Sequence, residues 1–151
     1  MSEVNLFTAE VQKDADDPDG YHNSYARVGP QVGAEQLGLS VYELPPGQSI
    51  CPYHYENAEE EWLIVLTGRP TLRTPDGERQ LRPGDTVCFP AGAAGAHAVR
   101  GPGRILMLGA RRVPSVVVYP DSDKVGTRPA DPSDRLNFPR SAAVGYWDGE
   151  A

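Results

Sequence analysis

Glycine and proline recur at short intervals along this chain, and this spacing restricts the fold more than any other feature of the sequence. The 151 residues include 16 glycines and 15 prolines, and many of them stand between short apolar stretches. Proline removes a backbone donor and glycine readily adopts positive φ, so both favour turns and interrupt helices. The pattern therefore predicts an all-β protein, an antiparallel barrel or sandwich with little room for long helices.

The apolar stretches between these turns predict a series of short strands. Pro75-Asp76-Gly77 separates two of them, and Asp-Gly in such a place is typical of a tight hairpin. The expected strands cover residues 38–44, 49–55, 61–67, 69–74, 78–81, 86–89, 96–99, 104–108 and 116–119.

A chain of this length fits a single domain. The predicted strands fall within residues 35–119, which we expect to form one barrel. Residues 1–34 and 120–151 are more polar and carry too little periodic apolar sequence for a core of their own. We therefore expect them to be N- and C-terminal arms that pack on the barrel.

Charge and composition exclude several classes of partner. The formal net charge is −7, which repels phosphate backbones and anionic lipid, so we expect neither nucleic acid nor membrane as a partner. The chain has no run of roughly 18 apolar residues and no secretory leader pattern at its start, which makes cytoplasmic residence the expectation, with Cys51 and Cys88 reduced. Most arginines lie from Arg69 onward, so an arginine-bearing surface could still meet an anionic small molecule.

Ligand-type side chains gather on two of the predicted strands. Side chains alternate across a strand, so His54 and Glu56 project from the same face. Glu61 begins the next strand, and adjacent antiparallel strands bring opposed Cβ atoms to roughly 4.5–5.5 Å. His97 follows about forty residues later, after a Gly/Ala loop, and could join them. A lone histidine is more often a satisfied core residue, but two histidines with carboxylates in register favour a metal site.

These residues resemble the first motif of the cupin superfamily of small β-barrels. That motif has a Gly, then His-x-His, a Glu and a further Gly. The matching positions are Gly47, His54, Glu56, Glu61 and Gly68. Glu56 replaces the second histidine, and the gap before His54 is one residue longer.

The second cupin motif is also matched. It has a Gly, then Pro-x-Gly, and later His and Asn. The matching positions are Gly84, Pro90, Gly92 and His97. The segment Ala93-Ala94-Gly95-Ala96 lengthens the gap before the histidine, and Arg100 or Gly101 stands where Asn is usual. The resemblance covers roughly residues 38–112 and implies an antiparallel jelly-roll barrel.

The resemblance implies a divalent metal inside the barrel, held by His54, Glu61 and His97. Glu56 is either a fourth ligand or, if it stands free beside the metal, a candidate catalytic general base. Mn, Fe, Ni, Co and Zn all accept mixed nitrogen and oxygen ligands, so the metal stays open. The family includes sugar isomerases, polyketide cyclases and dioxygenases, which implies a metal-dependent enzyme acting on a small metabolite. The alternative is a non-catalytic cupin that binds or senses a small molecule.

The strand at residues 61–67 also predicts how the chain associates. Its segment Trp62-Leu63-Ile64-Val65-Leu66 is apolar on both faces, whereas a strand with one face in water alternates. The outer face therefore needs a cover. We expect a homodimer, with a docked arm as the alternative.

Overall fold

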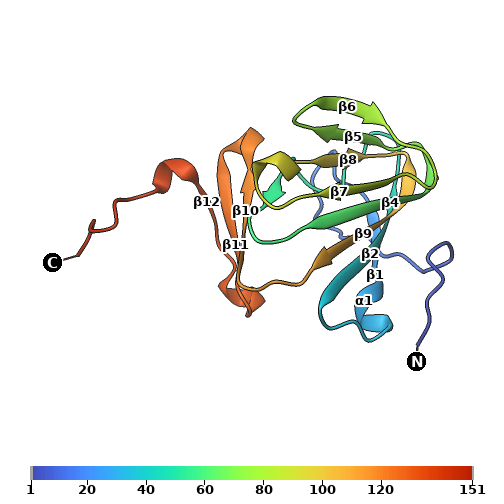
Figure 1. The fold of residues 1–151 in the computed structure, drawn as a ribbon, viewed down its shortest axis with the longest axis horizontal. Helices are drawn as coiled ribbons and strands as arrows, with labels where there is room; N and C mark the ends of the chain where they lie inside the picture. Colours follow the sequence, from blue (N-terminus) through green and yellow to red (C-terminus); the bar gives the residue numbers. More distant parts are fainter. Residues whose placement is uncertain (1, 151) are drawn as a thin grey trace.

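The structure is a computed structural model that describes residues 2–150. Its named strands pair antiparallel and form three sheets, which lie together around one interior (Figure 1). The sheet orders are β1-β2-β9-β4-β7, β12-β11-β10-β3 and β6-β5-β8. The predicted all-β antiparallel fold of the jelly-roll type is confirmed.

The strands are short, as the turn spacing predicts. They are β1 (Ser24–Arg27), β2 (Leu37–Leu44), β3 (Tyr55–Glu56), β4 (Glu61–Gly68), β5 (Thr71–Thr74), β6 (Gly77–Gln80), β7 (Thr86–Phe89), β8 (Ala98–Arg100), β9 (Gly103–Ala110), β10 (Ser115–Tyr119), β11 (Lys124–Arg128) and β12 (Asn137–Pro139). The helices are single turns: α1 (Val28–Gln31) and the 3₁₀ turns η1 (Ala93–Gly95), η2 (Pro120–Ser122), η3 (Pro132–Asp134) and η4 (Arg140–Ala142). Among the described residues, no helix is long and apolar enough to cross a membrane.

Side chains alternate between the two faces of β4 and so contribute to two separate apolar clusters. Leu63 and Val65 point inward and are buried in a core with residues of β2, β5, β7, β8 and β9. Ile64 and Leu66 point outward and pack in a second cluster that also contains Val4 and other residues of the N-terminal segment. The N-terminal segment therefore covers part of the outer face that the sequence leaves apolar.

The hairpin between β5 and β6 has the turn that the sequence predicts. Thr74 pairs with Gly77 at its end, and Gly77 adopts a φ of 117°. Glycine reaches this backbone region without the steric cost that a Cβ would add. The register of β5 and β6 follows from this turn.

The predicted strand at residues 49–55 is the main difference from the sequence-based expectation. Ser49 and His54 form single bridges to Arg100 and His97, and a strand with a named partner begins only at Tyr55. Pro52 has no N–H to donate to a ladder, which is one reason why the segment bends instead of pairing continuously.

The terminal segments contain strands that the sequence analysis did not predict. β1 lies within residues 1–34 and forms the edge of the five-stranded sheet, and β11 and β12 lie within residues 120–151 and extend the sheet of β10. Beyond β12, the chain extends away from the sheets (Figure 1). Tyr146 and Trp147 on this extension are 85% and 74% exposed.

Candidate metal centre

His54 and His97 lie directly opposite each other on neighbouring segments of backbone. The His54 N–H donates to the His97 carbonyl at 3.1 Å, and the His97 N–H donates to the His54 carbonyl at 2.8 Å. Two residues that exchange both bonds project their side chains from the same face. Both histidines are buried, and their ring centroids are 4.8 Å apart. The backbone itself therefore brings the two imidazoles together.

Glu61 completes a group of three converging side chains. Its Oε2 lies 3.6 Å from His54 Nε2 and 3.7 Å from His97 Nε2, and one ligand atom of each residue lies within 4.8 Å of the others. β4 carries Glu61 on the inward face that also holds Leu63. The three predicted ligands His54, Glu61 and His97 are thus brought together in the interior.

The far nitrogen of each imidazole is held by the backbone. His54 Nδ1 lies 3.0 Å from the Pro52 carbonyl oxygen, and His97 Nδ1 lies 2.9 Å from that of Gly95. A carbonyl oxygen only accepts, so the network assigns the proton to Nδ1 in each case. In the neutral ring this leaves the Nε2 lone pair directed at Glu61. Metal-binding histidines are commonly oriented by such a bond.

Burial and the neighbouring charges shift the pKa values of the two histidines in opposite directions. Burial lowers the pKa of His54, but its contacts with Cys51 and Glu61 outweigh this and raise it to about 10. Burial and the nearby positive charge of His54 lower the pKa of His97 to about 4. Burial raises the pKa of Glu61, but the contact with His54 and the positive charges around it leave that pKa lowered overall. One proton on His54 therefore lies beside an ionised Glu61 and a neutral His97.

The donor set fits a divalent metal ion. Oε2 of Glu61 is buried and has no hydrogen-bond partner among the described residues. Three atoms that each offer a lone pair need a positive charge between them, either a proton or a cation. Two imidazole nitrogens and one carboxylate oxygen suit Mn, Fe, Co, Ni and Zn. Such an ion would replace the proton on His54.

Glu56 is buried like His54, but it faces a different partner. Arg128 Nη1 lies 2.6 Å from Glu56 Oε1 in an ion pair, and Glu56 is outside the group of three ligand atoms that converge. In the sheet, Glu56 pairs with Val117, and Val117 pairs with Gly126. Directly opposed residues share a face, and Arg128 comes two residues after Gly126, so its side chain reaches Glu56 from the same face.

Burial is the main influence on the Glu56 carboxyl. It raises the pKa of Glu56 to about 7, because the lowering effect of the Arg128 charge is smaller. The charges of Glu61 and His54 also act on this carboxyl, so it lies within the electrostatic range of the candidate metal centre. A carboxyl with a pKa near neutrality can take up and release a proton at physiological pH.

Several residues around the site escaped the sequence analysis. Phe89 and Tyr119 stack on the rings of His97 and His54, and Arg128 pairs with Glu56. None of them stands in a recognisable local motif. Cys51, three residues before His54, also lies at the site, with its Sγ 3.5 Å from His54 Nδ1.

The sequence of the central part of the chain matches a known domain family. The model of the family described as "Cupin domain" matches residues 40–109, which include the three converging residues. A comparison with curated proteins finds no match.

Solved structures resemble the chain over a greater length. A sugar phosphate isomerase of the cupin superfamily from Silicibacter pomeroyi is 25% identical with a TM-score of 0.80, over 97% of this chain and 98% of that one. A candidate sugar phosphate isomerase from Acidithiobacillus ferrooxidans is 28% identical with a TM-score of 0.75, over 83% and 81%.

A third structure shares the fold alone. The polyketide cyclase RemF from Streptomyces resistomycificus is 24% identical with a TM-score of 0.58, over 76% of this chain and 83% of that one. Family match, fold and the converging His-Glu-His group agree with one another. Residues 40–109 are thus a cupin domain by sequence match, and the fold around them is similar to that of a cupin-superfamily structure over most of the chain.

Proposed function

We propose that this cupin is a metal-dependent enzyme that isomerises a small hydroxy-carbonyl metabolite by proton transfer. The observation that carries the proposal is the convergence of His54 Nε2, His97 Nε2 and Glu61 Oε2 in the interior, with both Nδ1 atoms held by carbonyl groups. A bound divalent metal would polarise a carbonyl and so acidify the neighbouring C–H. His54, Glu61 and His97 would hold the ion.

Glu56 would move the proton in this reaction. As a carboxylate it would accept the proton from the carbon next to the carbonyl and return it to the former carbonyl carbon, while the hydroxyl proton passes to the carbonyl oxygen. The reaction rearranges atoms within one molecule and needs no oxidant or reductant. A pKa of about 7 for Glu56 suits this task, because base and conjugate acid are both present at neutral pH. This role is preferred over a fourth metal ligand because Arg128 already pairs with Glu56.

The similarity to solved structures supports an isomerase. Two of the compared structures that cover most of this chain are described as sugar phosphate isomerases, one of them as a candidate. The cyclase alternative has support from fold similarity alone, and fold does not fix function. The homodimer, the cytoplasmic location and the small-molecule substrate expected from the sequence remain parts of the proposal.

Hydrogen exchange into substrate would test the proposal directly. The protein is first analysed for metal without exposure to chelator and then incubated in D₂O with a panel of small hydroxyaldehydes and hydroxyketones. The ¹H NMR signal of the proton on the carbon next to the carbonyl should disappear as deuterium replaces that proton. Glu56→Gln should suppress this exchange while metal content persists. A metal-loaded protein that binds panel members without exchange would favour the non-catalytic binding cupin.

A further inference from the structure

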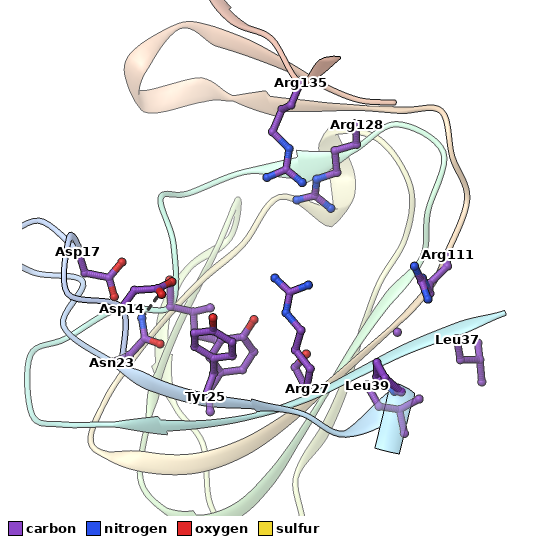
Figure 2. Close-up of a pocket in the computed structure, with 15 residues that line it drawn as sticks. Asp14, Asp17, Asn23, Tyr25, Arg27, Leu37, Leu39, Arg111, Arg128 and Arg135 are labelled. Atoms are coloured by element: carbon purple, nitrogen blue, oxygen red, sulfur yellow. Dashed lines mark hydrogen bonds between the residues drawn. The ribbon is translucent and has the colours of Figure 1, made fainter. Parts of the chain in front are cut away.

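A cavity of about 490 Å³ opens between the inner face of β1 and β2 and the chain around β11. Four arginines line it: Arg27, Arg111, Arg128 and Arg135. Figure 2 shows Arg128 and Arg135 reaching into the cavity from one wall, while Arg27 rises toward them from the opposite wall. Residues distant in sequence therefore direct guanidinium groups into one space.

Three of these arginines lack a carboxylate partner. Among residues 2–150, only Arg128 of the four has an acidic oxygen within 4.0 Å, that of Glu56. Asp14 and Asp17 also line the cavity, but Figure 2 places them to one side, away from Arg128 and Arg135. In a chain of net charge −7, positive groups that face one another without acidic partners indicate a place for an anion.

The cavity and the candidate metal centre share the inner face of the five-stranded sheet. Glu61 pairs with Gly109, and Gly109 pairs with Gly38, which lines the cavity. Opposed residues point to the same face, so Gly109, which has no side chain, stands between Glu61 and Gly38 in the cavity floor. Two strand spacings amount to about 10 Å. A Cβ at Gly38 would lie 3.7 Å from the Arg111 side chain, so the row leads toward the arginines.

A second link runs through Arg128. Its guanidinium contacts the buried Glu56 and also lines the cavity. A small molecule could therefore hold one end against the arginines and place the other near His54, Glu61 and His97. Guanidinium forks match the oxygens of phosphate and carboxylate, and each side chain can donate two parallel hydrogen bonds.

We propose that Arg27, Arg128 and Arg135 bind the anionic group of the substrate, a phosphate monoester or a carboxylate, while its carbonyl end lies at the candidate metal centre. The inference rests on the proposed function for one point, that the other end of the substrate is a carbonyl group. The anion site itself depends only on the arginines. It can therefore be tested without metal and without turnover.

Anion titration of the full-length protein, dialysed free of metal and chelator, tests the site. Inorganic phosphate and malonate are the probes, followed by calorimetry and by melting temperature at constant ionic strength. Arg27→Gln and Arg135→Gln should each weaken binding of the preferred anion about tenfold, and the double variant should abolish it. Arg79→Gln is the matched control, because Arg79 is exposed on β6 outside the cavity, and it should bind as the parent does.

The two probes distinguish the source of the anion. Phosphate binding that depends on the arginines assigns a phosphate monoester, and malonate binding that depends on them assigns a carboxylate. Binding of neither probe at tens of millimolar, or binding that both arginine variants retain, overturns the inference. Titration of a divalent metal into the same samples afterwards separates the two proposals. Arginine-dependent anion binding without any metal uptake would sink the proposed function alone, and metal uptake without anion binding would sink this inference alone.

Discussion

Phe89 lies flat against His97, with ring centroids 3.7 Å apart and 6° between the ring planes. Phe89 ends β7 and is buried in the core, next to Leu63 and Val65 of β4. The imidazole therefore has a rigid wall on one side and the Gly95 carbonyl at its Nδ1. Core packing, in addition to the backbone, fixes the direction of the His97 lone pair.

Phe89→Leu should loosen that ring as well as the core. We expect a loss of about 1–2 kcal/mol in the free energy of unfolding and roughly tenfold weaker metal binding, because partners that orient a ligand affect affinity by 10–100-fold. Urea denaturation and calorimetric metal titration would measure the two effects. Ile105→Val, another core truncation, should lower stability to a similar extent and leave metal affinity unchanged. Equal affinities in both variants would contradict the orienting role of Phe89.

Removal of either imidazole should abolish stabilisation by metal. If the centre binds a divalent ion, the ion should raise the melting temperature by mass action, since the native state alone gathers the ligands. His54→Ala and His97→Ala should each remove this rise. His22→Ala serves as the control, because His22 is exposed and its ring bonds Asp19 outside the converging group. Differential scanning calorimetry with Mn, Fe, Co, Ni and Zn is the measurement. A rise that survives His97→Ala would mean that the metal binds elsewhere.

Metal binding should release a proton over a wide pH range. The pKa of His54 is raised to about 10 and that of His97 is lowered to about 4, so at pH 8 only His54 carries a proton that the ion must displace. Calorimetry at pH 8 in two buffers of different ionisation enthalpy should report release of about one proton. The affinity should therefore keep rising from pH 6 toward pH 10, well above the range expected for an unperturbed imidazole. Binding that is independent of buffer would exclude a protonated His54.

Glu56 should make the stability of the protein depend on pH. Its pKa rises from 4.5 in the unfolded chain to about 7 in the native state, so the native state holds the proton more tightly. The resulting stability is present below pH 4.5 and is lost as the pH rises through 7. Relative to Glu56→Gln, the parent protein should lose up to about 3 kcal/mol between pH 4.5 and pH 8. Parallel curves of unfolding free energy against pH for the two proteins would refute this.

The uncovered part of the outer sheet face predicts self-association. Trp62 is 41% exposed and Leu37 is 50% exposed, and both line an apolar hollow of about 310 Å³ together with Ile64 and Leu108. A homodimer through this face would bury them. Light scattering at micromolar concentration should give a dimer mass, and Trp62→Glu should give a monomer. Trp147→Glu, in the projecting C-terminal extension, should leave the mass unchanged. A monomeric parent protein would contradict the homodimer and favour a docked arm as the cover of this face.

Local chemistry accounts for what the sequence predicted well. β7 has the predicted bounds, residues 86–89, because the turn Pro83-Gly84-Asp85 precedes the apolar run and Pro90 ends it. The β5–β6 hairpin follows from Asp76-Gly77, and the convergence of His54, Glu61 and His97 follows from motif spacing. Each of these features is decided by residues close together in the chain or by a pattern specific to one fold.

Features decided by distant contacts were missed. β11 has the sequence Lys-Val-Gly-Thr-Arg, whose mixed polarity carries no strand pattern, and it pairs with β10 and β12 in the sheet. The pairing of Arg128 with Glu56 joins residues far apart in sequence, so no local signal announces it. The division into arms and barrel, and the role of Glu56, stay predictions.

The backbone pairing of His54 with His97 bears on which metal would occupy the candidate centre. Among the described residues, the converging ligand group has three members, one of them a carboxylate. The backbone positions these ligands in advance, but three ligands of this kind do not select one metal ion by their geometry. First-row divalent ions then follow the usual order of affinity from manganese up to copper, so abundance in the cell decides occupancy. Protein made in different hosts or growth media should carry different metals. The metal supply during expression is therefore an experimental variable as important as any substitution.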